Sequence, residues 1–266
     1  MADAEIGDKI RCRFRKEGDL RLLSHHDLMR CVERMLRRAQ LPFRLTQGYH
    51  PCPRIIFAQA LPLGVAGLAE VLEIEFTQPL PLSETLEALN REAPSGLVFT
   101  TAKIIPLNVN AVPRRAVYEF PIPPDRNTEI SERCQHLLAA ATIWIDKQHP
   151  RPRRVNVRPY LRSLEIDQQR LRVDTWITGH GSIRIEEFLA QFGLDDELAR
   201  GSVLTRTWLE LHDEVPPTEA MDAPPNGPPE TVPLESIPPS PTDEGGDDRP
   251  PWRGAWGLSP NGPVVE

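Results

Sequence analysis

A serine, two histidines and an aspartate stand together early in the chain, as Ser24-His25-His26-Asp27. A neutral imidazole can accept or donate a proton near pH 7, so His25 or His26 could act as a general acid or base. The same residues predict a helix start, with Ser24 as the N-cap and Asp27 three residues later. The backbone N–H groups at a helix start favour an anion, which a histidine could help to hold. Capping alone, phosphate binding and catalysis are all compatible with this cluster.

The helix that we predict over residues 24–39 has an apolar stripe and an arginine stripe. The arginine stripe comprises Arg30, Arg34, Arg37 and Arg38. From residue 9 to residue 54 the chain has 12 basic and four acidic residues. Such a local excess favours a surface that binds a polyanion, and an ordinary solvated basic face is the alternative.

A loop at residues 48–54 carries Gly48, Tyr49, His50 and Arg54. Two prolines in the loop restrict its backbone, so its polar groups can be held in place at little entropic cost. An aromatic ring beside a basic group suits a nucleotide that stacks while its phosphate is bound. The alternative is a packed tyrosine in a structural loop.

Arginine, proline and an aromatic residue recur in the second half, at Arg158-Pro159-Tyr160. The surrounding segment 151–162 has five arginines and no acidic residue. We therefore add Arg158 and Tyr160 to the predicted binding residues, although a single tyrosine is also a common core residue. The chain has no glycine-rich phosphate-binding signature and no GxSxG nucleophile elbow.

The chain has four cysteines without any short paired spacing: Cys12, Cys31, Cys52 and Cys134. This pattern predicts free thiols in a reducing compartment and no metal site built by this chain. A site at His50 and Cys52 would need two further ligands, which only the distant histidines at 25 and 26 could supply.

Strict alternation in residues 9–15 predicts a half-buried strand whose outer face, formed by Arg11, Arg13 and Arg15, is basic. In the rest of the first half we predict strands at 55–58, 70–76 and 97–104 and a helix at 83–92 capped by Ser83. In the second half we predict strands at 115–122, 153–166, 170–178 and 202–211 and helices at 130–145 and 183–192, the last ended by Gly193.

The order strand, helix, strand, strand, helix, strand therefore occurs twice. It predicts an α+β fold of two tandem ferredoxin-like (βαββαβ) units, at residues 1–108 and 109–212.

The formal net charge of −7 is unevenly distributed over the 266 residues. Residues 213–266 hold 11 acidic and two basic residues, together with 14 of the 29 prolines. We predict that this segment is an acidic, Pro-rich, disordered tail, because it cannot bury enough apolar surface to offset its ordering entropy. An interaction tail anchored by Trp252 and Trp256 is the alternative.

The chain has no run of 18 apolar residues, and its first residues lack the apolar core of a secretory signal. These two observations predict no transmembrane helix, no signal peptide, no membrane partner and a cytoplasmic location.

Three separated motifs resemble one known family. They are the run 14–30, the run 47–55 with Leu61-Pro62-Leu63-Gly64, and Asn156-Val157-Arg158-Pro159-Tyr160-Leu161. Together they resemble the uncharacterised radical-SAM-linked protein family, a domain of unknown function, over about residues 9–212. The family pattern usually has Asn where His50 stands and varies at Cys52, which weakens a catalytic or metal role for both. Gly48, Pro51, Pro53 and Arg54 match the pattern.

The resemblance implies a radical SAM protein as partner, fused to this domain or encoded beside it. This chain lacks a Cys-x-x-x-Cys-x-x-Cys motif. The resemblance therefore implies an iron–sulfur cluster and S-adenosylmethionine on the partner, and no cofactor on this chain.

Our first hypothesis is an accessory module, not an enzyme on its own, that presents RNA or another phosphorylated substrate on its arginines. The alternative is a metal-independent endoribonuclease that uses His25 or His26. That alternative follows from architecture, since CRISPR repeat-processing endoribonucleases also have tandem ferredoxin-like folds and often use a histidine. A third reading is an adaptor whose arginine stripe docks an acidic protein.

Overall fold

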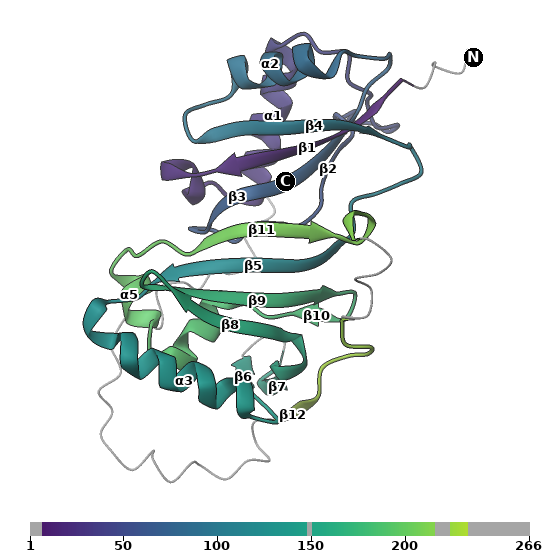
Figure 1. The fold of residues 1–266 in the computed structure, drawn as a ribbon. Coiled ribbons are helices and arrows are strands. Elements are labelled where there is room, and N and C mark those ends of the chain that lie inside the picture. Colours follow the sequence, from purple (N-terminus) through teal and green to yellow (C-terminus); the bar gives the residue numbers. More distant parts are fainter. Residues whose placement is uncertain (1–6, 148–150, 216–223, 234–266) are drawn as a thin grey trace, which may run out of the picture.

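The computed structural model describes residues 7–147, 151–215 and 224–233 of the chain (Figure 1). The first half contains β1 (Lys9–Lys16), α1 (His25–Arg38), β2 (Ile55–Phe57), β3 (Ala66–Glu75), α2 (Leu82–Glu92) and β4 (Leu97–Ile105). The second half contains β5 (Pro113–Pro121), α3 (Asn127–Ala139), β6 (Trp144–Lys147), β7 (Arg153–Asn156), β8 (Leu161–Asp167), β9 (Arg170–Thr178), β10 (Gly181–Ser182), α4 (Ile185–Phe188), α5 (Asp195–Ala199) and β11 (Thr205–Leu211). Strand β12 (Thr231–Pro233) follows.

Short 3-10 turns link these elements: η1 (Gly18–Leu22), η2 (Pro124–Arg126), η3 (Arg158–Tyr160), η4 (Leu189–Phe192) and η5 (His212–Glu214). The chain has an α+β fold, as predicted. No helix among the described residues has the length and apolar character that crossing a membrane requires.

Nine strands form one sheet in the order β10-β9-β5-β11-β3-β1-β4, with β2 beside β3 and β8 beside β9. Within this sheet the first half has the order β4-β1-β3-β2 and the second half has the order β11-β5-β9-β8. The halves meet where β11 runs parallel to β3 at two register positions, Ala66 and Gly67. The other end of the same β3 edge pairs with β2, so one strand edge serves both halves.

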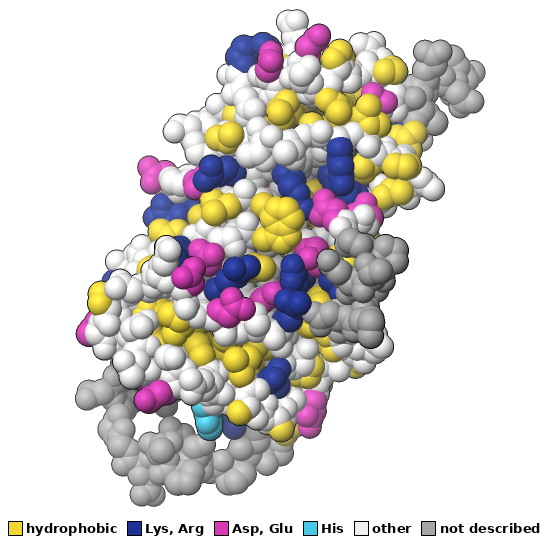
Figure 2. All heavy atoms as spheres, viewed as in Figure 1, with side chains coloured by type: hydrophobic (Ala, Val, Ile, Leu, Met, Phe, Trp, Pro, Cys, Tyr) yellow, Lys and Arg dark blue, Asp and Glu magenta, His cyan; other side chains and the backbone are white. Residues whose placement is uncertain are grey.

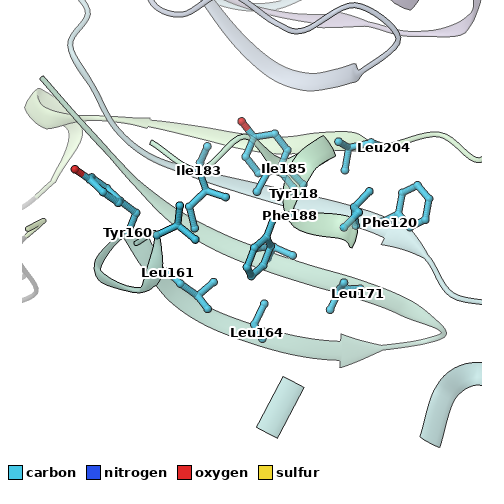
Figure 3. Packing of buried hydrophobic residues seen from close by; sticks show 14 of the residues in the cluster. Tyr118, Phe120, Tyr160, Leu161, Leu164, Leu171, Ile183, Ile185, Phe188 and Leu204 are labelled. Atoms are coloured by element: carbon cyan, nitrogen blue, oxygen red, sulfur yellow. The ribbon is translucent and has the colours of Figure 1, made fainter. Parts of the chain in front are cut away.

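The helices cover one face of this sheet, and the buried apolar residues form two clusters, the larger of which also includes Leu61, Val65 and Val71 of the first half. In the first half the alternate residues Ile10, Cys12 and Phe14 of β1 are buried in a cluster with Val32 and Met35 of α1. In Figure 1 α1 lies behind these strands. In the second half Figure 3 shows Tyr118, Phe120, Leu171 and Phe188 among the side chains packed between the strands and α4.

The structure confirms the locally encoded elements. The alternation at 9–15 is strand β1, and the apolar stripe at 24–39 is α1, whose N-cap is Ser24. Gly193 ends the helical segment of α4 and η4 with φ 62°, a left-handed conformation that glycine adopts without a Cβ penalty.

Three details of the predicted elements are wrong. The N-cap of α2 is Pro81, without a side-chain cap, instead of Ser83. Ile145 belongs to β6, because α3 already ends at Ala139. The strand predicted at 153–166 is interrupted by η3, where Pro159 cannot donate a ladder hydrogen bond.

Residues 213–215 and 224–233 of the predicted tail make defined contacts with the rest of the fold. β12 pairs antiparallel with β7 and completes a small sheet in the order β12-β7-β6. The Asn156 backbone N–H donates to the Glu230 carbonyl at 2.9 Å. The amino-acid composition of a segment does not reveal backbone pairing with a distant strand, so the sequence did not predict β12. Trp252 and Trp256 lie outside the described residues.

The outer face of β1 is also different from our prediction. Register places Arg11 opposite Glu73 and Lys9 opposite Glu75, and both basic side chains are buried. The Arg11 Nη2 and Lys9 Nζ atoms each lie 2.9 Å from the Glu73 carboxylate. Because each cation has a carboxylate partner, this face is a layer of ion pairs rather than a solvated basic surface.

Candidate functional site

The start of α1 is held by reciprocal hydrogen bonds between Ser24 and Asp27. The Asp27 backbone N–H donates to Ser24 Oγ at 3.2 Å, and the Ser24 hydroxyl donates to Asp27 Oδ2 at 2.6 Å. The predicted cap is therefore confirmed. It also places the Asp27 carboxylate where the helix start favours an anion. An external phosphate would have to bind beside this carboxylate, so the helix end alone is a poor phosphate site.

The two histidines of the cluster lie in different environments. His25 is half-buried, and its ring centroid is 5.2 Å from that of Phe57 in an edge-on contact. His26 is exposed, with its ring centroid 6.0 Å from that of His25. Burial lowers the pKa of His25, and the nearby His26 and Lys16 lower it further. His25 is therefore a neutral imidazole at neutral pH, which can accept a proton.

The lowered pKa of His25 predicts a measurable pH dependence. We expect the His25 ring signals in an NMR titration to move below pH 6.5, the ordinary histidine pKa. Because the unfolded chain then binds the proton more readily, the free energy of unfolding falls as pH drops from about 6.5 through the folded-state pKa. A His25→Gln variant should lose less stability over that window. A His25 midpoint at or above 6.5 would refute this.

The arginine stripe of α1 divides into two pairs. Arg37 lies 2.8 Å from Glu33, and Arg38 lies 2.9 Å from Glu92, so their charges are balanced by carboxylates. Arg30 and Arg34 are exposed, and Arg30 has only a loose contact to Asp27 at 3.6 Å. Arg30 and Arg34 are therefore the members of the stripe best placed to meet a ligand.

The loop that carries the second predicted cluster folds back on itself. Arg54 N–H donates to the Arg44 carbonyl at 2.8 Å, and Thr46 N–H donates to the Cys52 carbonyl at 2.8 Å. At its tip the Tyr49 side chain is 95% exposed. A tyrosine in a packed structural role would be buried, so Tyr49 is not a core residue.

Some predicted residues come together and others do not. Arg37 of α1 lies over the ring of Phe43 at 5.4 Å, and His25 contacts Phe57, so the segment 43–57 is attached to α1 near both helix ends. Arg54 bonds to Glu75 at 2.9 Å, at the far end of β3. The neighbouring Ile74 packs in the cluster with α1, so the side chains of Glu75 and Arg54 lie on the opposite face of the sheet. Arg54 therefore does not share a surface with His25 and the arginines of α1.

Arg158 and Tyr160, the predicted binding residues of the second half, make their contacts within the second half and the segment after it. Arg158 donates to the carbonyls of Leu138, Ala140 and Leu161 at 2.9 to 3.1 Å, which is a structural role. Tyr160 is buried, and its hydroxyl lies 3.5 Å from the Gly227 carbonyl. These contacts contradict the predicted binding role of Tyr160, because it offers no surface to a ligand.

One hollow in the second half is lined by none of the predicted site residues. It has a volume of about 580 Å³ and is lined by α3, the start of β6 and Gln191. The described residues contain no group of three or more His, Cys, Asp or Glu side chains placed to hold a metal ion.

Sequence reasoning missed the charged and aromatic residues of the open sheet face, above all Trp208. One signal for the buried charges was present. Glu73 and Glu75 alternate in the segment 70–76 as Lys9 and Arg11 do in 9–15, and complementary alternating strands pair across a sheet.

The comparisons with known proteins give one clear result. The family model described as "Uncharacterized protein conserved in bacteria (DUF2344)" matches residues 9–189, and the chain belongs to this family. No curated protein matches the chain. Among solved structures, a chain of the "Crystal Structure of a Cbf5-Nop10-Gar1 Complex" is similar at 14% identity and a TM-score of 0.38. The match covers 75% of this chain and 48% of that chain, so it spans about half of the latter. A TM-score this low supports no statement about function.

Proposed function

We propose that this chain is an accessory binding module that works with a radical SAM partner and presents RNA or another phosphorylated substrate. The observation that carries the proposal is the exposed surface of α1 and its attached loop, with Arg30, Arg34 and Tyr49. Arginines that are only loosely paired can meet phosphates, and an exposed aromatic ring can stack on a base.

In this proposal each half of the chain is a ferredoxin-like unit, and the two are arranged in tandem. The support is the strand pairing, because both halves place their first and third strands at the centre of the same four-strand order. The insertion of β6 and β7 in the second half is the main difference between them.

The radical SAM partner rests on the family resemblance of the three motifs. The proposal assigns the iron–sulfur cluster and S-adenosylmethionine to that partner. Of the cysteines in this chain, Cys12 and Cys134 are buried, and burial raises their thiol pKa to about 12 and about 11 respectively. Such thiols are poor ligands, because a metal binds the thiolate. Co-elution of the chain with a radical SAM protein from the same genome would test the partnership.

Binding to a fluorescent single-stranded RNA, measured across salt concentrations, tests the substrate class. We expect affinity to fall with salt, because phosphate contacts release counterions. An Arg30→Ala/Arg34→Ala variant should reduce the slope of log K against log salt by about 0.7 for each phosphate that the two arginines neutralise in the parent.

The matched control is Arg170→Ala/Arg184→Ala, which removes the same charge from arginines of the second half that pair with Glu119 and Glu187. Equal losses in both variants, or an affinity that does not depend on salt, would contradict the proposed surface.

A metal-independent ribonuclease is the second candidate, favoured by the lowered pKa of His25 beside His26. A general base must be neutral at the working pH, and His25 meets this requirement. If the parent cleaves RNA in the presence of a chelator and His25→Ala/His26→Ala does not, the enzyme reading replaces the binding module. Binding without cleavage by the parent supports the module.

A further inference from the structure

A second cationic and aromatic site lies on the sheet face opposite the helices, where β1, β4 and β11 contribute side chains. We call Arg13, Lys103 and Trp208 the sheet-face site. Figure 2 shows basic, acidic and hydrophobic side chains side by side over the central strands of this face. The Arg13 guanidinium lies 4.0 Å from the centre of the Trp208 ring.

The indole of Trp208 is covered on one side by the Arg13 guanidinium and is still partly exposed. The Arg13 side chain is 13% exposed, whereas Trp208 is 39% exposed. The ring therefore shields the guanidinium, while part of the ring stays open to solvent. Arg13 is held from below as well, because it donates to the carbonyls of Ala69 at 3.0 Å and Leu209 at 3.1 Å. The site is thus preorganised by backbone contacts.

Two carboxylates of the chain itself form ion pairs with cations in and beside this site. They belong to η5, directly after β11 and at the start of the acidic segment. Glu214 pairs with Arg13 and lies 3.4 Å from Lys103. Asp213 accepts from Arg11 through both carboxylate oxygens, at 2.8 and 2.7 Å. Arg11 also has Glu73, so only Arg13 and Lys103 would lose their carboxylate partner if η5 moved away.

We infer that the sheet-face site binds single-stranded nucleic acid, that Glu214 competes with its phosphates, and that Asp213 holds η5 in place through Arg11. Cations that track the backbone, beside an aromatic ring on which a base stacks, are the two elements of sequence-independent single-strand binding. An acidic peptide would use the cations and leave the exposed part of the indole without a role. The inference rests on the proposed function and adds a second contact surface to that of α1.

The test is a titration of the full chain with fluorescent oligouridine RNA at two salt concentrations. We expect Asp213→Asn/Glu214→Gln to bind RNA more tightly than the parent, with a salt slope steeper by about 0.7 for each cation that gains a phosphate. The matched control Asp195→Asn/Glu197→Gln removes two acidic charges from α5, away from the site, and should change the affinity far less. Trp208→Ala, introduced into the Asp213→Asn/Glu214→Gln variant, should weaken RNA binding by about tenfold, because one stacked base is lost.

The inference is overturned if Asp213→Asn/Glu214→Gln binds RNA no more tightly than the control, or if Trp208→Ala has no effect in that background. Equal affinity for oligoglutamate and RNA at the same salt concentration would replace nucleic acid by an acidic peptide. The α1 surface is tested separately by Arg30→Ala/Arg34→Ala. Loss of binding in that variant alone, with no response at Asp213 and Glu214, refutes the sheet-face site while the proposed function stands. If only Asp213→Asn/Glu214→Gln and Trp208→Ala change the affinity, the sheet-face site stands and the proposed α1 surface is refuted.

Discussion

Replacing Glu70 by alanine is expected to lower the free energy of unfolding by about 3–5 kcal/mol, the cost of leaving a buried charge without its partner. The partner is Arg206 of β11, which is completely buried and donates from Nε to Glu70 Oε1 at 2.8 Å. A second contact joins Arg206 Nη2 to the other carboxylate oxygen. Burial opposes the charge of Arg206, but attraction and hydrogen bonding to Glu70 outweigh it and raise the pKa. Without Glu70 the guanidinium still stays charged, because arginine is not deprotonated in proteins.

Urea unfolding followed by circular dichroism measures this loss, and two further variants test its cause. Glu33→Ala removes a carboxylate from the exposed pair with Arg37 and should cost no more than about 1 kcal/mol. Glu70→Leu/Arg206→Met should recover most of the stability, because apolar residues can replace a buried pair at little cost. A loss in Glu70→Ala as small as that in Glu33→Ala would contradict a buried-charge explanation.

The effect is large because this pair joins the two halves of the sheet. Glu70 lies on β3 and Arg206 on β11, and these strands share only two register positions. At one of them, Gly67, a Cβ atom would lie 2.5 Å from the Glu70 Cγ atom. The glycine thus leaves the space that the Glu70 side chain fills. We expect the junction to depend on the charged pair more than on the short strand contact.

Phe192→Ala is expected to cost about 3–5 kcal/mol, as for other buried phenylalanines. Phe192 is completely buried, and its ring centroid lies 5.5 Å from that of Phe188 in an edge-on contact. The lost burial and the cavity left behind both contribute. Because the sheet is continuous through β3 and β11, we also expect both halves to unfold in one transition, at a lower urea concentration than the parent.

The exposed residue Leu22 provides the control, since Leu22→Ala should change stability by no more than about 0.5 kcal/mol. Trp208 is at the junction and Trp176 in the second half, so fluorescence and circular dichroism together can follow the transition. Two separate unfolding transitions would contradict this prediction. If Phe192→Ala lowered the urea midpoint of only one of them, the halves would unfold independently.

The predictions that succeeded depended on neighbours within a few residues. The alternation of residues 9–15 and the cap formed by Ser24 and Asp27 are local patterns, and the structure has both. The failures depended on distant partners. Local alternation predicts Arg11 on an outer basic face, but its partners Glu73 and Asp213 lie 62 and 202 residues away in sequence. The burial of Tyr160 and its contact with Gly227 are likewise non-local, so no local pattern shows that this tyrosine is a core residue.

By itself the sequence determined the strands with clear alternation, such as β1, and the apolar face and arginine stripe of α1, because side-chain periodicity and capping act within single elements. Only the tertiary structure decided which charges are exposed. The packing of β3 between β1 and β11 buries Lys9, Arg11 and Arg206 with carboxylates, while Arg30 and Arg34 stay open to solvent. A charge is buried only where folding brings it a partner, and that depends on chain segments that no local pattern connects.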